Sequence, residues 1–213
     1  MIIAVDGSAA SGKGTLAKRL AAHFNLAHLD TGSLYRCLAL DLLKFGYLPE
    51  KIEESLAAAA IQDLDLSMAG SKAIRTDEVA GMASIIAAMP LVRQNFVAFQ
   101  RQFASARPDH AGAILDGRDI GSVILPDADF KFFIDADLDE RAQRRTRELQ
   151  DVGQSVMFRD VLEDMRDRDR RDRERSTAPL KAADGAMIID TTRLDADSVF
   201  AVAVNHIENQ REQ

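Results

Sequence analysis

The sequence lacks the features of a secreted or membrane-spanning protein. Cys37 is the only cysteine, so no internal disulfide can form and a reducing compartment is expected. No stretch approaches the roughly 18 consecutive apolar residues that a membrane-spanning helix needs. The apolar start of the chain is interrupted by Asp6, which argues against a secretory signal. These absences predict a cytoplasmic protein with no membrane partner.

An excess of positive charge is also absent. The formal net charge is −7, which disfavours nonspecific binding to nucleic acids or membrane surfaces. Any phosphate-bearing ligand must therefore be met by local clusters of arginine and lysine. His23 and His28 have no partners at metal-ligand spacing and are interpreted as structural. The 213 residues, 46% hydrophobic and 29% charged, suit one α/β domain with a full core.

A glycine-rich motif lies near the start of the chain. Residues 7–15 read Gly-Ser-Ala-Ala-Ser-Gly-Lys-Gly-Thr and match G-x-x-x-x-G-K. An apolar run with β-branched residues precedes the motif, and Leu16, Leu20 and Phe24 follow it at helical spacing. Strand, glycine-rich turn and helix form the setting in which this motif binds phosphate, because backbone N–H groups at the helix start can approach an anion.

The motif also assigns roles to single residues. Lys13 would reach the terminal phosphates as a point charge. Gly14 follows the lysine where Ser or Thr is usual. Thr15 comes one place later, so its contact with Mg²⁺ is expected to be indirect. The predicted phosphate-binding loop comprises Gly7, Ser8, Ala9, Ala10, Ser11, Gly12, Lys13, Gly14 and Thr15.

Short apolar runs separated by helical patterns indicate the fold class. After the first strand, the runs predicted to be strands are 27–29, 113–116, 130–134 and 186–190. Strands alternating with helices predict an α/β fold with a five-stranded parallel sheet and helices on both faces. The stretch between the second and third strands is too long for a simple crossover, so a mostly helical insertion is expected there.

Local patterns predict finer details. One helix is expected to be capped by Thr31 or Ser33, and another to run from Pro49 through the alanines at 57–60. Residues 63–67 alternate like a strand. Side chains expected to face the core are Leu91, Phe96, Phe99, Phe103, Val199, Val202 and Ile207. Side chains expected on the exposed side of a helix capped by Asp137 are Arg141, Arg144 and Arg145.

Polar residues follow the predicted strands at the sheet edge where ligands gather. Asp30-Thr31-Gly32 follows the second strand, and Asp116-Gly117-Arg118-Asp119 follows the third. Asp116 stands where P-loop enzymes place the acid that holds Mg²⁺ through water. The alternative is an aspartate that only shapes the turn. We favour the metal role because an arginine and a second aspartate follow at once.

The run 166–175 alternates arginine with acidic residues. Such runs are usually solvated helical faces held by i,i+4 pairs. Residues at i, i+3, i+4 and i+7 share one face, and here they are Arg168, Arg171, Asp172 and Arg175. Three guanidiniums and a carboxylate on one face suit a triphosphate, a transferring phosphoryl group and a sugar hydroxyl. The pattern therefore predicts a functional face, and Gly153 before it predicts a mobile lid.

Together these residues resemble the nucleoside monophosphate kinases, which are P-loop NTPase-type proteins, and most closely the bacterial cytidylate kinases. The resemblance extends from Ile2 to about Asp190. Its segments are the loop at 7–15, Asp30-Thr31-Gly32, Tyr35-Arg36, Ile74-Arg75-Thr76, Asp116-Gly117-Arg118-Asp119 and the arginine-rich run before Ala178-Pro179-Leu180. The family often has Ser at Thr31, and bacterial members usually carry a longer β-rich insertion than residues 61–75 allow.

The resemblance implies an enzyme that transfers the γ-phosphoryl group of ATP to CMP or dCMP with Mg²⁺. It implies a monomer with small-molecule partners only. Its parts would be a core of 1–32, 106–148 and 176–213, an acceptor-binding insertion at about 33–105 and a lid at about 149–175.

The resemblance also implies roles for the site residues. The loop with Lys13 would hold ATP, and the implied catalytic residues are Lys13, Arg118, Arg171 and Arg175. Around the acceptor, its phosphate would be met by Arg36, Arg118 and Arg175, its base by Ser84, Arg93 and Asp119, and its sugar by Asp172 and Arg168. Thr31 and Tyr35 would complete the acceptor site, and Thr15 and Asp116 would serve the metal, through water where direct contact is not made.

Two other functions remain open from the residues. A P-loop kinase for a small metabolite such as shikimate would share the loop. A noncatalytic nucleotide sensor would bind ATP, but it would not need Asp116 and the arginine face together.

The helical spacing in 166–175 predicts a contrast between neighbouring arginines. Arg171→Ala and Arg175→Ala should each strongly reduce turnover, because both lie on the predicted functional face. Arg170→Ala and Arg173→Ala should be mild, because they lie on other faces. Steady-state turnover of the four variants measures the contrast, and equal losses at all four positions would show that only bulk positive charge matters.

Overall fold

Five parallel strands form the centre of the structure, a computed structural model that describes residues 1–105, 109–151 and 153–211. The strands are β1 (Ile2–Gly7), β2 (Ala27–Asp30), β3 (Ala113–Gly117), β4 (Phe130–Asp135) and β5 (Met187–Asp190). They pair in the order β2-β3-β1-β4-β5, and each pair is parallel. The predicted α/β fold with a five-stranded parallel sheet is confirmed.

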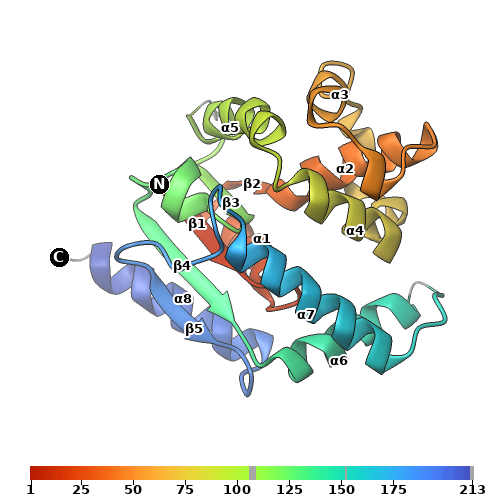
Figure 1. Cartoon of the computed structure of the whole chain (residues 1–213). Coiled ribbons are helices and arrows are strands. Elements are labelled where there is room, and N and C mark those ends of the chain that lie inside the picture. The colour runs from red at the N-terminus through yellow and green to blue at the C-terminus, as the bar shows by residue number, and fades with distance from the viewer. Residues whose placement is uncertain (106–108, 152, 212–213) are drawn as a thin grey trace.

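Eight α-helices surround this sheet in the described part of the chain (Figure 1). They are α1 (Lys13–Phe24), α2 (Thr31–Lys44), α3 (Glu54–Ala59), α4 (Asp77–Ile86), α5 (Pro90–Ser105), α6 (Leu138–Asp151), α7 (Phe158–Glu174) and α8 (Ala196–Arg211). Helices α1 and α8 pack on one face of the sheet. Helix α5 and a π-helical turn at Ile120–Ile124 pack on the other face.

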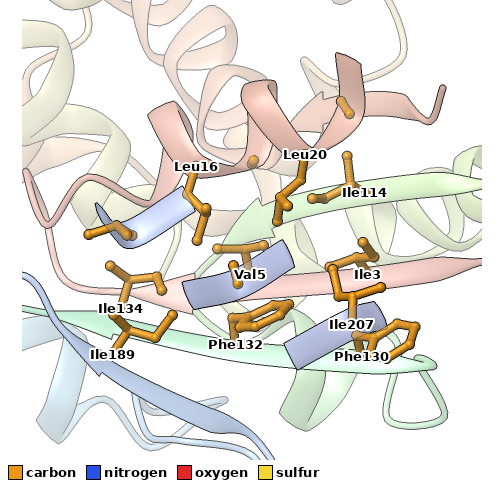
Figure 2. Close-up of a cluster of buried hydrophobic side chains, with 14 of the residues drawn as sticks. Ile3, Val5, Leu16, Leu20, Ile114, Phe130, Phe132, Ile134, Ile189 and Ile207 are labelled. Carbon is orange, nitrogen blue, oxygen red and sulfur yellow. The ribbon is translucent and has the colours of Figure 1, made fainter. Parts of the chain in front are cut away.

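Alternate residues of β1 point to opposite faces, as the period of a strand requires. Ile3 and Val5 pack with Leu16 and Leu20 of α1 in the larger core cluster (Figure 2). Ala4 belongs to the cluster on the opposite face. Because helices cover both faces of the sheet at β1, both of its faces are buried, which explains its continuous apolar run.

Two further clusters lie away from the sheet. Helices α2, α4 and α5 share one of them, in which Cys37 is buried as a core residue. Helices α6 and α7 share the other, built on Ala142, Leu149, Val161 and Met165. Figure 1 shows these two helical groups on either side of the carboxyl ends of the strands. The edge where ligands were expected therefore lies between them.

The helical insertion departs from the predicted details in three ways. Asp30, rather than Thr31 or Ser33, caps α2, since its carboxylate accepts from Ser33 N at 3.2 Å. The expected helix from Pro49 is split into a 3₁₀ turn (Pro49–Lys51) and α3, because Ile52 and Glu53 are extended. The strand expected at 63–67 is wrong. Residues 63–65 form a turn and irregular chain, two 3₁₀ turns (Leu66–Gly70, Lys72–Arg75) follow, and the apolar residues of this segment pack on α2.

Several side chains expected in the core are exposed. On α5 the buried positions include Val92, Phe96 and Gln100, which leaves Leu91 and Phe99 turned outward. On α8, Val199, Ala203 and Ile207 face the sheet and Val202 does not. The buried residues of each helix follow a four-residue spacing along one face, which passes through Gln100 in α5 and Ala203 in α8 rather than through Phe99 and Val202.

No single helix in the described ranges combines the length and apolar composition needed to cross a membrane; α4 and α5 reach them only as a pair bent by 96°.

Candidate active site

A cleft of about 780 Å³ opens where the strands end. Its walls come from the glycine-rich loop, from α2, α4 and α5, from the turn after β3, and from α6 and α7. Of the residues that the sequence singled out, those that line the cleft are Ala9, Ala10, Gly12, Lys13, Gly14, Thr15, Thr31, Tyr35, Arg36, Ser84, Arg93, Asp116, Arg118, Asp119, Arg168, Arg171, Asp172 and Arg175. Gly7, Ser8 and Ser11 do not line it. The structure thus gathers side chains from distant parts of the chain into one space.

The glycine-rich loop passes very close to β4. A Cβ atom on Gly7 would lie 2.0 Å from the Ile134 carbonyl oxygen, and the Gly7 φ angle is +155°. Only glycine fits at this position. Within the loop, Lys13 Nζ donates to the Ser8 carbonyl at 3.0 Å. The loop is therefore folded around its own lysine, whose ammonium lies beside the cleft.

The Lys13 ammonium sits in unfavourable surroundings for a charge. Burial, reinforced by the nearby Arg118 guanidinium, lowers the pKa of Lys13 to about 7. Asp116 acts in the opposite direction. A cation that is largely desolvated and close to another cation is stabilised by an anion, so this end of the cleft favours a phosphate.

Asp116 is fixed by a residue that the sequence analysis treated as structural. His28 Nε2 lies 2.7 Å from Asp116 Oδ1, and Thr31 Oγ1 donates to the Asp116 carbonyl at 2.9 Å. Both partners lie on or just after β2, next to β3 in the sheet. His28 thus orients the carboxylate, and only the three-dimensional neighbourhood of β2 and β3 reveals this.

The far end of the cleft contains a buried ion pair. Arg93 of α5 donates to Asp119, which follows β3. Burial raises the pKa of Asp119, and Arg93 and Arg175 oppose that shift. Arg175 Nη2 forms an ion pair with Asp119 at 3.6 Å, and among the residues that the structure describes neither it nor Ser84 Oγ has a hydrogen-bond partner. Buried donors without a hydrogen bond near a carboxylate suit a polar ligand that can both donate and accept.

Between the two ends, guanidiniums dominate. Arg118 Nε donates to Asp172 at 2.8 Å. Burial and the charge of Arg118 lower the pKa of Arg168 to about 9, and its Nε has no partner. Burial also lowers the pKa of Arg36, to about 10. A bound anion would stabilise these desolvated guanidiniums.

Asp6 supports a turn beside the cleft, a role that the sequence analysis did not predict. It accepts from Ile120 N at 2.7 Å and from Gly121 N at 2.8 Å. These bonds hold the turn that presents Arg118 and Asp119 to the cleft. Its position near the end of an apolar strand gave a weak signal, since a buried carboxylate there must find donors.

Contacts across the mouth of the cleft were also missed. Arg145 of α6 donates to Asp77 Oδ1 at 2.8 Å and to the Arg75 carbonyl at 3.0 Å. Arg75 in turn lies 3.3 Å from Asp30. These residues join α6 to the start of α4, and no local sequence pattern predicts such a contact.

The expected exposure of three arginines on α6 is wrong, since Arg144 and Arg145 are half-buried and Arg141 is buried. Arg141 was expected on the exposed side, yet it is only 2% exposed. Its guanidinium makes a two-point contact with Asp169 of α7, at 3.2 and 2.6 Å. Most residues of α6 are polar, so its sequence pattern did not distinguish Arg141, which points inward to the buried carboxylate of Asp169.

The family described as "Cytidylate kinase" matches residues 3–209 of the chain. The "Cytidylate kinase" of Methylocella silvestris is 50% identical over 209 residues, which cover 98% of this chain and 94% of the relative. That of Paramagnetospirillum magneticum is 45% identical over 210 residues and covers 99% of each chain. The identity thus extends over the whole length, including both helical groups beside the cleft.

A solved structure of an uncharacterized protein from Eubacterium ventriosum has a similar fold. It superimposes with a TM-score of 0.54 at 18% sequence identity, and the match covers 98% of each chain. At that identity the likeness concerns the fold alone.

Binding of a polyanion to the loop should be accompanied by proton uptake at Lys13. At pH 8 its lowered pKa of about 7 leaves most Lys13 side chains neutral in the free protein, and a bound anion restores the charged form. Calorimetric titration with inorganic tripolyphosphate, in buffers of different ionisation enthalpy, should therefore show uptake of up to about one proton. Affinity should weaken as the pH rises above about 7.

The matched controls are two lysine variants. Lys13→Ala should abolish the proton uptake, whereas Lys72→Ala, at an exposed site outside the cleft, should leave it unchanged. Undiminished uptake in Lys13→Ala would show that another group takes up the proton.

Proposed function

The chain belongs to the cytidylate kinase family, and from this premise we propose that it transfers the γ-phosphoryl group of ATP to CMP or dCMP, with release of ADP and CDP or dCDP. The observation that carries the proposal is a single cleft with a phosphate loop at one end and the Arg93–Asp119 pair at the other. The loop suits a nucleoside triphosphate, and the pair suits a base with both an amino group and ring acceptors.

The donor nucleotide would lie along the loop. Its phosphates would contact the backbone N–H groups of residues 7–15 and Lys13, which follows the terminal phosphates. A second cavity, of about 460 Å³, begins at the same loop and is bounded by Leu16, Leu194 and Val199 on its apolar side. Arg144 and Arg147 of α6 line its other side. We assign this cavity to the adenine, because apolar walls and planar guanidiniums suit an aromatic base.

The residues beside the loop fit Mg²⁺. Thr15 and Asp116 both line the cleft and offer oxygen donors, which this ion prefers. Gly14 leaves the space beside the carboxylate open, since a Cβ there would come within 3.6 Å of Asp116 Oδ2. When bound, the ion would neutralise charge that develops on the phosphates. Asp116, oriented by His28, would hold it directly or through water.

The acceptor nucleotide would occupy the far end. Its phosphate would be met by Arg36, Arg118 and Arg175. Its sugar hydroxyls would share Asp172, which now accepts from Arg118, and would contact Arg168. The base would be read by Ser84, Arg93 and Asp119, with Tyr35 and Thr31 forming the wall near α2. The unpaired Ser84 Oγ and Arg175 Nη2 are the donors such a ligand would satisfy.

Transfer between the two nucleotides needs positioning and charge neutralisation rather than covalent help from the protein. Lys13, Arg118, Arg171 and Arg175 supply positive charge along the path of the phosphoryl group. The lid at about 149–175 would close over it and exclude water. The insertion at about 33–105 would carry the acceptor toward the core. That the protein acts as a cytoplasmic monomer stays a prediction.

Release of ADP tests the proposal directly. Turnover should be high with CMP or dCMP and low with UMP, AMP and shikimate. Lys13→Ala should lose roughly 10²-fold or more in turnover, because a charge aimed at the transition state is removed. Turnover with shikimate alone would indicate a small-metabolite kinase, and ATP binding without any ADP release would indicate a sensor.

Base choice should depend on Asp119. Cytosine presents an amino donor where uracil presents a carbonyl oxygen, so a carboxylate favours CMP over UMP by about tenfold to a hundredfold. Asp119→Asn keeps the shape and can still accept from Arg93, and its amide can donate to uracil. The ratio of kcat/KM for CMP to that for UMP should therefore collapse toward one.

A matched control separates base reading from folding. Asp65→Asn alters an exposed turn cap in the insertion and should leave the CMP-to-UMP ratio unchanged. Equal losses with both substrates in Asp119→Asn would mean that Asp119 only supports the fold.

A further inference from the structure

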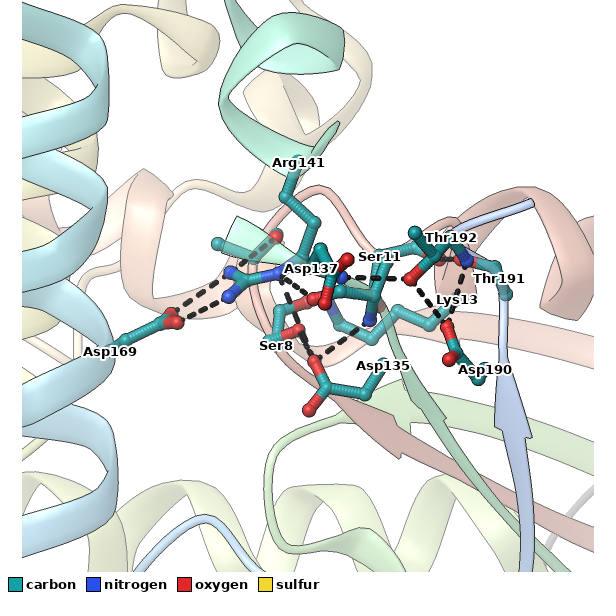
Figure 3. Close-up of polar contacts among 12 residues, drawn as sticks. Ser8, Ser11, Lys13, Asp135, Asp137, Arg141, Asp169, Asp190, Thr191 and Thr192 are labelled. Carbon is teal, nitrogen blue, oxygen red and sulfur yellow. Dashed lines mark hydrogen bonds and ion pairs between the residues drawn. The ribbon is translucent and has the colours of Figure 1, made fainter. Parts of the chain in front are cut away.

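Arg141 contacts three separate parts of the protein with one buried guanidinium (Figure 3). Its Nε donates to the Ala136 carbonyl at 2.8 Å, just after β4. Its Nη1 donates to the Ala9 carbonyl of the phosphate loop at 3.3 Å. Both terminal nitrogens donate to Asp169 of α7. No step of the proposed reaction uses this residue, so its contacts need another explanation.

The loop contact fixes the direction of a peptide group. All described peptide bonds are trans, and in a trans peptide the C=O and the N–H point in opposite directions. Because Arg141 holds the Ala9 carbonyl, the Ala10 N–H must point away from Arg141. Ala10 has a left-handed φ of +56°, a conformation that costs a non-glycine residue energy and needs external support.

Helix α6 also supports the next part of the loop, through Thr191, which follows β5. Thr191 Oγ1 donates to the Ser11 carbonyl at 2.9 Å, which orients the Gly12 N–H in the same manner. Arg144 of α6 donates to the Thr191 hydroxyl at 3.0 Å and to its carbonyl at 2.7 Å. Helix α6 therefore supports two peptides of the loop, one directly and one through Thr191.

The contact with Asp169 sets the rotation of α7. Asp169 lies next to Arg168 in the sequence and is buried. The two-point pair prevents α7 from turning about its axis without breaking a charged contact. Arg168, Arg171 and Asp172 on the cleft side of α7 are thereby held at a fixed position relative to the loop.

We propose that Arg141 is a positioning residue for phosphoryl transfer, one that ties the Ala9–Ala10 peptide of the phosphate loop to the arginine face of α7. The inference rests on the proposed function. A buried ion pair adds little net stability compared with a well-packed apolar pair, so stability alone does not account for a guanidinium at this position. The need to hold the phosphate loop at a fixed position relative to α7 does account for it.

Replacing both partners of the Arg141–Asp169 pair separates a positioning role from a contribution to stability. The double variant Arg141→Met with Asp169→Leu removes the buried charges together and should retain most of the melting temperature of the wild type. Its turnover should nevertheless fall by about 10²-fold, the loss typical of small displacements. The dissociation constant for ATP should rise by about tenfold, as one oriented hydrogen bond is lost, while KM for CMP should stay within about twofold of wild type.

Single variants test the Ala9 contact and the Asp169 contact separately, and an exposed arginine provides the control. Arg141→Lys should weaken ATP binding and change the response of the Ala10 amide resonance to inorganic tripolyphosphate. Asp169→Asn should lower turnover with little change in ATP affinity, because the Ala9 contact remains. Arg170→Lys, on the exposed side of α7, should behave as wild type in every measurement.

Two outcomes would overturn the proposal. A stable double variant with wild-type turnover and ATP affinity would show that the pair is only structural. Equal weakening of ATP and CMP would indicate general disruption of the cleft. If wild type itself fails to phosphorylate CMP, the proposed function fails instead, and tripolyphosphate binding with the Ala10 resonance still decides whether Arg141 orients the loop.

Discussion

Guanidiniums held close together in a partly dry cleft repel one another, and the fold balances this repulsion with carboxylates from other elements. Asp172 pairs with Arg118, and Asp119 pairs with Arg93. Arg168 keeps an unpaired nitrogen and a lowered pKa, so the balance is incomplete. The chain as a whole carries a net charge of −7, and a nucleotide phosphate beside Arg168 would complete the balance in the cleft.

Ion pairs also connect separate elements of the structure. Arg93 on α5 meets Asp119 after β3, Arg145 on α6 meets Asp77 at the start of α4, and α6 is tied to α7 through Arg141. The helical groups have apolar clusters of their own, so charged contacts form much of what connects them across the cleft. A phosphate that attracts these arginines would also act on the joints between the groups.

Local patterns in the sequence predicted the five strands, the glycine-rich loop and the arginine face of α7, whereas Ser84, Arg93 and Arg36 were expected in the site only from the family resemblance. A strand–glycine turn–helix segment and an i, i+3, i+4, i+7 face can be read from neighbouring residues. Contacts between distant elements cannot, which is why the His28–Asp116 contact and the inward direction of Arg141 were missed. The strand expected at 63–67 failed because packing on α2 overrode a short alternating pattern.

Burial disfavours the charged forms of two groups near the loop, Asp6 and Lys13. Burial raises the pKa of Asp6 to about 7. Between about pH 4 and 7 the folded state therefore binds more protons at Asp6 than the unfolded state, and the contribution of Asp6 to stability falls as pH rises through that range. Burial lowers the pKa of Lys13 to about 7.

Between about pH 7 and 10.5 the unfolded state binds more protons at Lys13, so its contribution to stability rises with pH. Together, Asp6 and Lys13 make their least favourable contribution to the stability of the free protein near neutral pH. Asp6 is retained because its two backbone bonds fix the turn that carries Arg118 and Asp119. Lys13 is retained because a bound phosphate restores its charge. A bound anion would thus relieve the cost at Lys13, whereas the cost at Asp6 is offset by its two backbone hydrogen bonds.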